Sequence, residues 1–436
     1  MKEDGQAKGL RRVLHNDVQG VFFAVFLWVI IGSINIYSAT YVEATIDGSL
    51  WAGFFVKHLV SLVLGFIILM AMYRMDYRRL RSQKVLNGMA VVLVILLVAV
   101  LVGGTVVNGA RRWLQFGPVS LQPSEFAKLG SVIWAAAYVE RQRWKQKYIH
   151  FFEYYEFGRS PGSNGRVPFF ARFLLMPLVY ALLTILQPDM GTAMLILGFG
   201  AILAAIGGIG YIRRIRGPML YVAVGGTLAV LGILSALVYL SPYRWERILA
   251  YVDPWSHAQG IGYQTVQSLL AVGSGGVLGQ GLGNGTAKYF YLPEAHTDFA
   301  FAVWSQETGL VGSLALLAIV LTFTWYGLRI AQQARDYFGA FVAFGITLII
   351  SGQALFNMMM VCGAMPVTGV PLPFVSYGGS SLMLNLGAVG ILASIGRYSL
   401  AAQQSPRVGT RGEAPSLREE TLSRFSVEGS STSRSR

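Results

Sequence analysis

Long apolar blocks constrain the fold of this chain more than any other feature of its sequence. A block of about 20 apolar residues can cross the hydrocarbon core of a membrane as a helix. Ten such blocks lie at residues 18–40, 51–73, 85–107, 121–139, 167–187, 189–209, 217–240, 299–327, 337–361 and 379–396. The sequence therefore predicts an all-α polytopic membrane protein with about ten transmembrane helices.

The composition supports a membrane protein over a set of soluble domains. Only 13% of the 436 residues are charged and 54% are hydrophobic, whereas soluble domains carry about 25% charged residues. The first block is too long for the core of a signal peptide and others follow it, which indicates an uncleaved signal anchor. The single cysteine, Cys362, excludes an intrachain disulfide and a zinc site built on several cysteines.

The basic residues predict the orientation of the chain. If both termini are cytoplasmic, 28 of the 35 Lys and Arg residues lie inside or near the inner end of a span, as the positive-inside rule requires. Those inner segments are 1–17, 74–84, 140–166, 210–216, 328–336 and 397–436, together with Arg172. The net charge of +14 thus reports topology and contact with anionic lipids, and nucleic acid is not expected as a partner.

The chain divides into a short cytoplasmic N-terminal segment (1–17), a transmembrane domain (18–397) and a cytoplasmic tail (398–436) whose composition predicts disorder. Spans seven and eight are separated by a large external loop, residues 241–298. A loop of this length is usually functional. Within it, residues 261–272 have the apolar spacing of a helix, which we expect to lie flat at the membrane interface.

Several charged side chains are predicted at the outer ends of the spans. Arg111 and Arg112 are adjacent arginines on the side that the charge bias disfavours, and guanidinium groups match phosphate. Arg244 and Arg247 share one helical face of the external loop. Glu125 and Lys128 are three residues apart and can pair, either to hold a helix end or to form part of a site.

Three further motifs have plain structural interpretations. Asp189 follows a proline, which predicts a turn and then a helix that Asp189 caps. The glycine-rich stretch 273–285 is too irregular for a nucleotide fingerprint, and we expect a flexible or re-entrant turn. The stretch 365–381 contains three prolines and a Gly-Gly pair, which predicts irregular backbone that lines a cavity rather than facing lipid.

Asp298 lies where the external loop meets the eighth span. An acid there can simply favour the helix dipole. Candidate cations from at least two other segments suggest more, because one base and several cations suit a reaction in which an alcohol displaces a lipid-linked phosphate. Asp298 is therefore our candidate catalytic residue.

At this point the chain resembles the SEDS family of peptidoglycan glycosyltransferases, which includes FtsW and RodA. The resemblance covers about residues 17–397. It rests on seven motifs in order: YSAT, GARRW, QPSEFAKL, QPDMGTA, DPWSHAQGIGYQTVQSLLAVGSGG, LPEAHTDFAFA and PVTGVPLPFVSYGGSS. The external loop looks more like the division branch, FtsW, and the elongation branch, RodA, stays open as an alternative.

The resemblance implies a function and a location. Members polymerise lipid II at the outer face of the bacterial cytoplasmic membrane, with undecaprenyl-pyrophosphate-linked glycan as the second substrate. They work with a class B penicillin-binding protein, a transpeptidase, and the division branch also works with other divisome proteins.

The family motifs also point to residues. The essential acid falls on Asp298, and further functional positions fall on Trp113, Glu125 and Lys128. We predict that substrate or pyrophosphate is bound by Arg111, Arg112, Trp113, Glu125, Lys128, Arg244, Arg247 and Ser376. One departure is the stretch SQETG, where Gln306 replaces the first of two acids and Glu307 remains. That puts in doubt any mechanism that needs both acids.

These expectations combine into a mechanism in which Asp298 acts as the general base of an inverting glycosyl transfer. The arginines neutralise the leaving pyrophosphate, with a divalent cation (Mg²⁺ or Mn²⁺) as an open possibility and no organic cofactor expected. Two other classes of function stay open: a lipid II flippase, which would need similar cations, and a membrane scaffold that recruits the transpeptidase.

Overall fold

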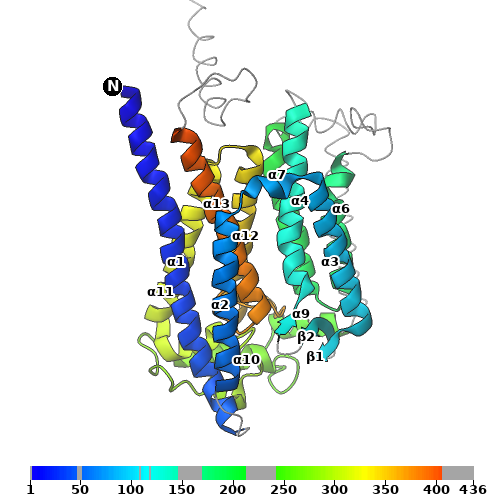
Figure 1. The fold of residues 1–436 in the computed structure, drawn as a ribbon. Coiled ribbons are helices and arrows are strands. Elements are labelled where there is room, and N and C mark those ends of the chain that lie inside the picture. Colours follow the sequence, from blue (N-terminus) through cyan, green and yellow to red (C-terminus); the bar gives the residue numbers. More distant parts are fainter. Residues whose placement is uncertain are drawn as a thin grey trace, which may run out of the picture.

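A computed structural model describes residues 2–46, 52–107, 110–116, 119–145, 169–212 and 242–404. Most of these residues are helical, and the helices form one elongated bundle (Figure 1). The strands, α9 and α10 gather at the same end of that bundle (Figure 1).

The long helices follow the apolar blocks. They are α1 (Lys2–Ile46), α2 (Ala52–Arg74), α3 (Gln83–Gly103), α4 (Pro123–Lys145), α6 (Phe169–Leu186), α7 (Met190–Ile212), α11 (Ala300–Gln332), α12 (Tyr337–Val361) and α13 (Gly379–Gln404). A short 3-10 turn, η1 (Tyr77–Arg81), joins α2 to α3.

Six helices in the described part of the chain are long and apolar enough to cross a membrane. They supply the candidate spans Asp17–Thr40, Phe54–Arg74, Gln83–Gly103, Ala300–Gln332, Tyr337–Val361 and Gly379–Leu400. Shorter apolar segments lie at Leu175–Leu186 and Met190–Leu203. A mostly helical, multi-pass membrane fold is thus confirmed. The predicted block 217–240 lies outside the described residues, and so does the tail from residue 405 onward. The count of ten spans and the orientation of the termini stay predictions.

A small sheet corrects the expectation of an all-helical chain. Strands β1 (Thr105–Val107), β2 (Ala110–Phe116) and β3 (Val119–Leu121) form an antiparallel sheet in the order β1-β2-β3. The predicted helical block 85–107 was therefore too long, because α3 ends at Gly103 and the extended residue Gly104 follows. The β-branched residues after it are suited to strand pairing, and Val106 lies opposite Arg111.

The core brings α1, α11 and the segment before α13 into contact. Trp28 is fully buried, and its ring packs edge-on against Phe323 and Phe374 with centroid distances of 6.1 and 5.2 Å. A Cβ atom on Gly32 would lie 1.9 Å from the carbonyl oxygen of Phe374. Glycine at this position therefore lets α1 approach the backbone of the irregular 365–378 segment.

The loop predicted to be external contains three short elements: α9 (Pro242–Val252), α10 (Tyr263–Ser274) and a single π-helical turn, η2 (Ala287–Tyr291). The helix expected at residues 261–272 is confirmed as α10. It packs against α11 and α12, and Ser268 donates a hydrogen bond to the carbonyl of Val361 at 2.8 Å. The loop is thus anchored to the helical bundle.

Candidate active site

A cavity of about 840 Å³ lies where the external loop meets the helical bundle. Its walls come from the sheet, from α9, from the turn before α10, from residues 293–299 and from the segment 367–382. Asp298, Arg112 and Arg247 all line it, and we call it the Asp298 cavity. Three segments far apart in the sequence thus bring one acid and two cations together, as the sequence predicted.

Asp298 lies directly before α11, and its backbone carbonyl is held by a side chain of α12. The Asn357 side-chain amide donates to the carbonyl oxygens of Asp298 at 2.8 Å and of Val370 at 2.7 Å. Asn357 is fully buried in α12. One side chain therefore ties the catalytic candidate to the wall formed by the 365–378 segment.

The surroundings of Asp298 favour its neutral form. The pKa of its carboxyl is raised from 3.8 to about 7, mainly by burial and also by the nearby carboxylates of Glu294 and Asp189. Arg112 and Arg247 act in the opposite direction. A carboxyl that titrates near neutral pH is suited to accept and release protons there.

Arg112 and Arg247 reach the cavity from different elements. A Cβ atom on Gly369 would lie 3.3 Å from Asp298 Oδ2 and 3.8 Å from Arg112 Nη1, so both side chains border the same glycine. Arg112 also donates to the carbonyl of Pro188. Arg247 Nη1 donates to the carbonyl of Val367 at 2.8 Å. These backbone contacts orient both guanidinium groups at the cavity wall.

The other predicted binding residues differ in their positions. Trp113 and Ser376 line the cavity. Ser376 Oγ donates to the carbonyl of Thr297 at 2.6 Å and accepts from the amide of Leu372 at 2.7 Å, so it holds two wall segments together.

Of the other two predicted arginines, Arg111 can be placed and the side chain of Arg244 cannot. Arg111 is exposed and its guanidinium lies 3.4 Å and 3.5 Å from the carbonyls of Leu101 and Val102, away from the cavity lining. Arg244 belongs to α9, and its side chain lies outside the described residues. The expected binding role of Arg111 thus finds no support in its position.

Glu125 and Lys128 form the predicted pair, with Lys128 Nζ 2.8 Å from Glu125 Oε1. Both side chains are almost fully buried and neither lines the cavity. Lys128 also donates to Gln353 Oε1, and Gln353 Nε2 donates to the carbonyl of Pro371 at 2.9 Å. The pair therefore stands directly behind the cavity wall rather than on its surface.

Asp189 begins α7 as predicted, because its Oδ1 accepts a hydrogen bond from the amide of Thr192 at 3.2 Å. The stretch 365–381 lines the cavity with irregular backbone, also as predicted. Sequence reasoning did not single out Asn357 or Gly369. A polar side chain inside an apolar span was the available signal for Asn357, whereas nothing local marks Gly369.

The carboxylates near the cavity could take part in holding a divalent cation. Mg²⁺ is commonly bound by one or two carboxylates and completed by water and substrate phosphates, and the carboxylate of Glu294 lines the cavity. Among the described residues, no group of three or more His, Cys, Asp or Glu side chains is close enough to form a protein-only metal site.

The fold and this site define a class: a multi-pass helical membrane protein with an acid and arginines in a cavity at one end of its bundle. Residues 19–400 match the family model of FtsW, RodA and SpoVE, described as "Cell cycle protein". The chain belongs to this family.

Individual relatives agree with this assignment. Stage V sporulation protein E of Bacillus subtilis is 38% identical over 381 residues, which cover 86% of this chain and 95% of that protein. The probable peptidoglycan glycosyltransferase FtsW of Geobacter metallireducens is 36% identical over 386 residues, covering 88% and 96%.

Solved structures show the same fold. A chain from work described as "Structural coordination of polymerization and crosslinking by a peptidoglycan synthase complex" aligns with a TM-score of 0.67 at 27% identity, covering 87% of this chain and 98% of that one. The rod shape determining protein RodA of Thermus thermophilus aligns with a TM-score of 0.58 at 26% identity, covering 87% and 96%.

Proposed function

We propose that this protein is a peptidoglycan glycosyltransferase that polymerises lipid II into glycan strands at the outer face of the bacterial cytoplasmic membrane. Relatives carry the name peptidoglycan glycosyltransferase. The observation that carries the proposal is the carboxyl of Asp298, whose pKa of about 7 is set in a cavity that it shares with Arg112 and Arg247.

In the proposed reaction, Asp298 is the general base. The GlcNAc 4-hydroxyl of lipid II attacks C1 of the MurNAc that ends the growing glycan, and Asp298 accepts the hydroxyl proton. The new C1–O4 bond forms as the bond from C1 to the pyrophosphate oxygen breaks, and undecaprenyl pyrophosphate leaves with the electron pair. This single displacement inverts the anomeric centre.

One carboxyl is enough for this chemistry. A glycosidase needs a second carboxyl to protonate a sugar alkoxide, whereas a pyrophosphate is a stable anion without added protons. Arg112 and Arg247 would stabilise the negative charge that develops on it. Trp113 would contribute an apolar wall next to them, since it lines the same cavity.

The partner and the cellular process belong to the same proposal. We propose a class B penicillin-binding protein as partner, because a neighbouring structure is a complex that couples polymerisation and crosslinking. The name FtsW among the relatives supports a role in division with other divisome proteins. The RodA-type role in elongation is the alternative.

A divalent cation is a further part of the proposal. Glu294, which lines the cavity, would hold it together with the pyrophosphate oxygens, and the bound ion would supply positive charge near the leaving group while Asp298 stays free to act as the base. Comparing polymerisation with and without a chelator, followed by adding back Mg²⁺ or Mn²⁺, tests this part separately.

The central experiment is polymerisation of purified lipid II by the purified protein, alone and with its transpeptidase. Wild type and Asp298→Asn run side by side, because asparagine keeps the shape of the side chain and removes the base. We expect long glycan strands from wild type only. Near-normal strands from Asp298→Asn would overturn the role of Asp298. A wild type that makes no strands but moves labelled lipid II across proteoliposome membranes would be a flippase.

A further inference from the structure

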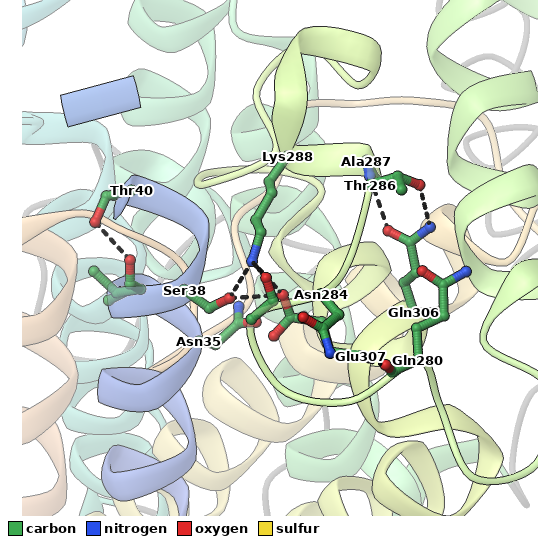
Figure 2. Close-up of polar contacts among 12 residues, drawn as sticks. Asn35, Ser38, Thr40, Gln280, Asn284, Thr286, Ala287, Lys288, Gln306 and Glu307 are labelled. Atoms are coloured by element: carbon green, nitrogen blue, oxygen red, sulfur yellow. Dashed lines mark hydrogen bonds and ion pairs between the residues drawn. The ribbon is translucent and has the colours of Figure 1, made fainter. Parts of the chain in front are cut away.

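The ends of the segment that carries Asp298 are joined to each other. Lys288 lies in η2 before this segment, and Glu307 lies in α11 after it. Lys288 Nζ is 2.7 Å from Glu307 Oε1, and each side chain is only 1% exposed. The pair (Figure 2) therefore closes residues 288–307 into a loop. Asp298 lies midway along this loop in the sequence.

Helix α1 supplies a third member of this cluster. Ser38 Oγ donates to Glu307 Oε1 at 2.6 Å and accepts from Lys288 Nζ at 2.8 Å (Figure 2). The remaining ammonium hydrogen of Lys288 is directed to the carbonyl of Gly283 at 2.6 Å. All three donors of the ammonium group are thus used, and the base of the loop is attached to α1. We call Ser38, Lys288 and Glu307 the 288–307 clamp.

Gln306 closes the same loop beside the clamp. Its side-chain oxygen accepts from the amide of Ala287 at 2.9 Å, and its nitrogen donates to Thr286 Oγ1 at 3.0 Å and to Ser274 Oγ at 2.9 Å. An ionised carboxylate cannot donate. Gln306, at a position where the family resemblance leads one to expect an acid, is therefore matched to its surroundings, and it leaves Glu307 as the charged member.

The backbone around Glu307 is also fixed by the preceding glycine-rich stretch. The amides of Gln280 and Gly281 each donate at 3.0 Å, to the carbonyls of Gln306 and Glu307 respectively. Helix α11 is interrupted two residues later at Gly309, whose φ of 67° suits glycine. The stretch predicted as a flexible or re-entrant turn is thus bonded to the kinked part of α11.

A separate contact with α1 holds the loop near Asp298 itself. Asn35 Nδ2 donates to the carbonyl of Ala300 at 3.0 Å, and Ala300 is two residues after Asp298. Asn35 and Ser38 lie one helical turn apart on α1. The same face of α1 therefore holds both the base of the loop and the start of α11.

We propose that Lys288 and Glu307 are positioning residues, and that the 288–307 clamp sets where the carboxylate of Asp298 meets Arg112 and the acceptor hydroxyl. Neither residue lines the Asp298 cavity, so neither touches substrate there. This inference rests on the proposed role of Asp298. Reaction rates respond strongly to the geometry of the reacting groups, and a displacement of about 1 Å can cost roughly a hundredfold.

The test separates positioning from simple stabilisation. Lys288→Met and Glu307→Gln each leave one buried charge without its partner, which destabilises folding. The double variant Lys288→Met/Glu307→Gln removes both charges, keeps the net charge and leaves side chains of similar size. The double variant does not change the net charge near the cavity. A shift in the titration midpoint of the Asp298 carboxyl then indicates that this carboxyl has moved relative to its neighbours.

Asp17→Asn is the matched control. Asp17 is a buried acid on α1 that pairs with Arg329 of α11 at 3.2 Å, so it joins the same two helices far from the cavity. For every variant of the full chain, three quantities are measured: the thermal midpoint, the initial rate of lipid II polymerisation per folded protein, and the infrared titration of the Asp298 carboxyl by difference from Asp298→Asn.

We expect the double variant to recover the thermal midpoint that the single variants lose, yet to polymerise at least about tenfold more slowly and to titrate at a shifted midpoint. Asp17→Asn should lose thermal stability and keep both the rate and the titration. A double variant with the wild-type rate and the wild-type titration midpoint would overturn the proposal. It would mean that Lys288 and Glu307 only stabilise the fold. If Asp298→Asn itself polymerises, the proposed role of Asp298 as base fails, and the infrared titration still decides whether the clamp positions Asp298.

Discussion

Gly369 lies against the carboxylate of Asp298, so closely that a Cβ atom there would be 3.3 Å from Asp298 Oδ2. Its φ is +73°, which L side chains rarely adopt. Gly369→Ala therefore combines backbone strain of about 1–2 kcal/mol with pressure on the carboxylate. We expect polymerisation to fall about tenfold or more, measured as initial rate per folded protein.

Gly363→Ala is the control for that substitution. Gly363 also has a φ of +73°, but the added Cβ atom would meet Leu269 instead, at 3.1 Å. The two variants should lose similar thermal stability. Equal losses of activity in both would mean that strain alone, and not the approach to Asp298, explains the effect of Gly369→Ala.

The pH dependence of polymerisation should follow the carboxyl of Asp298. The base must be ionised to act, and its pKa is raised to about 7, so kcat/KM should rise with pH through about 7 and level off above it. Glu294→Gln removes a nearby negative charge that raises this pKa. The midpoint of the pH profile of kcat/KM should therefore move to lower pH in Glu294→Gln. An unchanged midpoint would contradict the assignment of this titration to Asp298.

Asp298 should also make the protein less stable as pH rises. Its carboxyl binds its proton more tightly in the folded state than in the unfolded state, so ionisation opposes folding. The penalty is absent below about pH 4, grows between the unfolded pKa of 3.8 and the folded pKa of about 7, and is complete above that. Three pKa units give an upper bound of about 4 kcal/mol. Thermal midpoints at pH 5 and pH 8 should both show Asp298→Asn gaining on wild type, with a clearly larger gain at pH 8.

Arg112 and Arg111 are neighbours with different expected roles. Arg112 lines the Asp298 cavity, whereas Arg111 is exposed and lies against the carbonyls of α3. A hydrogen bond to a charged group contributes about 1.5–3 kcal/mol. Arg112→Gln should therefore lower kcat/KM for lipid II by about ten- to a hundredfold, and Arg111→Gln should leave it within about threefold. A larger loss in Arg111→Gln would reverse the two assignments.

The sequence predicted the long helices well, because about 20 consecutive apolar residues have few other stable arrangements. The block 337–361 coincides with α12, and the block 379–396 lies within α13. The sheet was missed because its strands are only three to seven residues long, and a short apolar run after a helix reads as more helix. Periodicity cannot resolve elements of that length.

The charged residues of the candidate site could be predicted from the sequence. The contacts that hold them in place could not. Asp298 and Arg112 stood out because charge is costly beside a membrane. Which of two adjacent arginines faces the cavity depends on how β2 pairs with its neighbours, which spacing does not show. The contacts that fix Asp298, from Asn357 and Gly369, come from segments about 60 and 70 residues further along the chain. Only the folded structure brings them together.

The buried pair of Glu125 and Lys128 provides the last prediction. Lys128→Met leaves Glu125 without its partner at 2.8 Å, and breaking a buried pair in this way costs about 3–5 kcal/mol. The double variant Glu125→Gln/Lys128→Met removes both charges and should recover most of the thermal stability.

The kinetics of that double variant distinguish support from substrate binding. The pair reaches the cavity wall indirectly. Lys128 donates to Gln353, which holds the carbonyl of Pro371 at 2.9 Å. Glu125 accepts from Ser381 of the cavity lining at 3.4 Å. Loosening that wall should lower kcat while KM for lipid II stays within about threefold, because no group that binds substrate is lost. A KM that rises while kcat is unchanged would instead show that Glu125 or Lys128 contacts the substrate directly, and that the cavity opens further towards α4 when substrate binds.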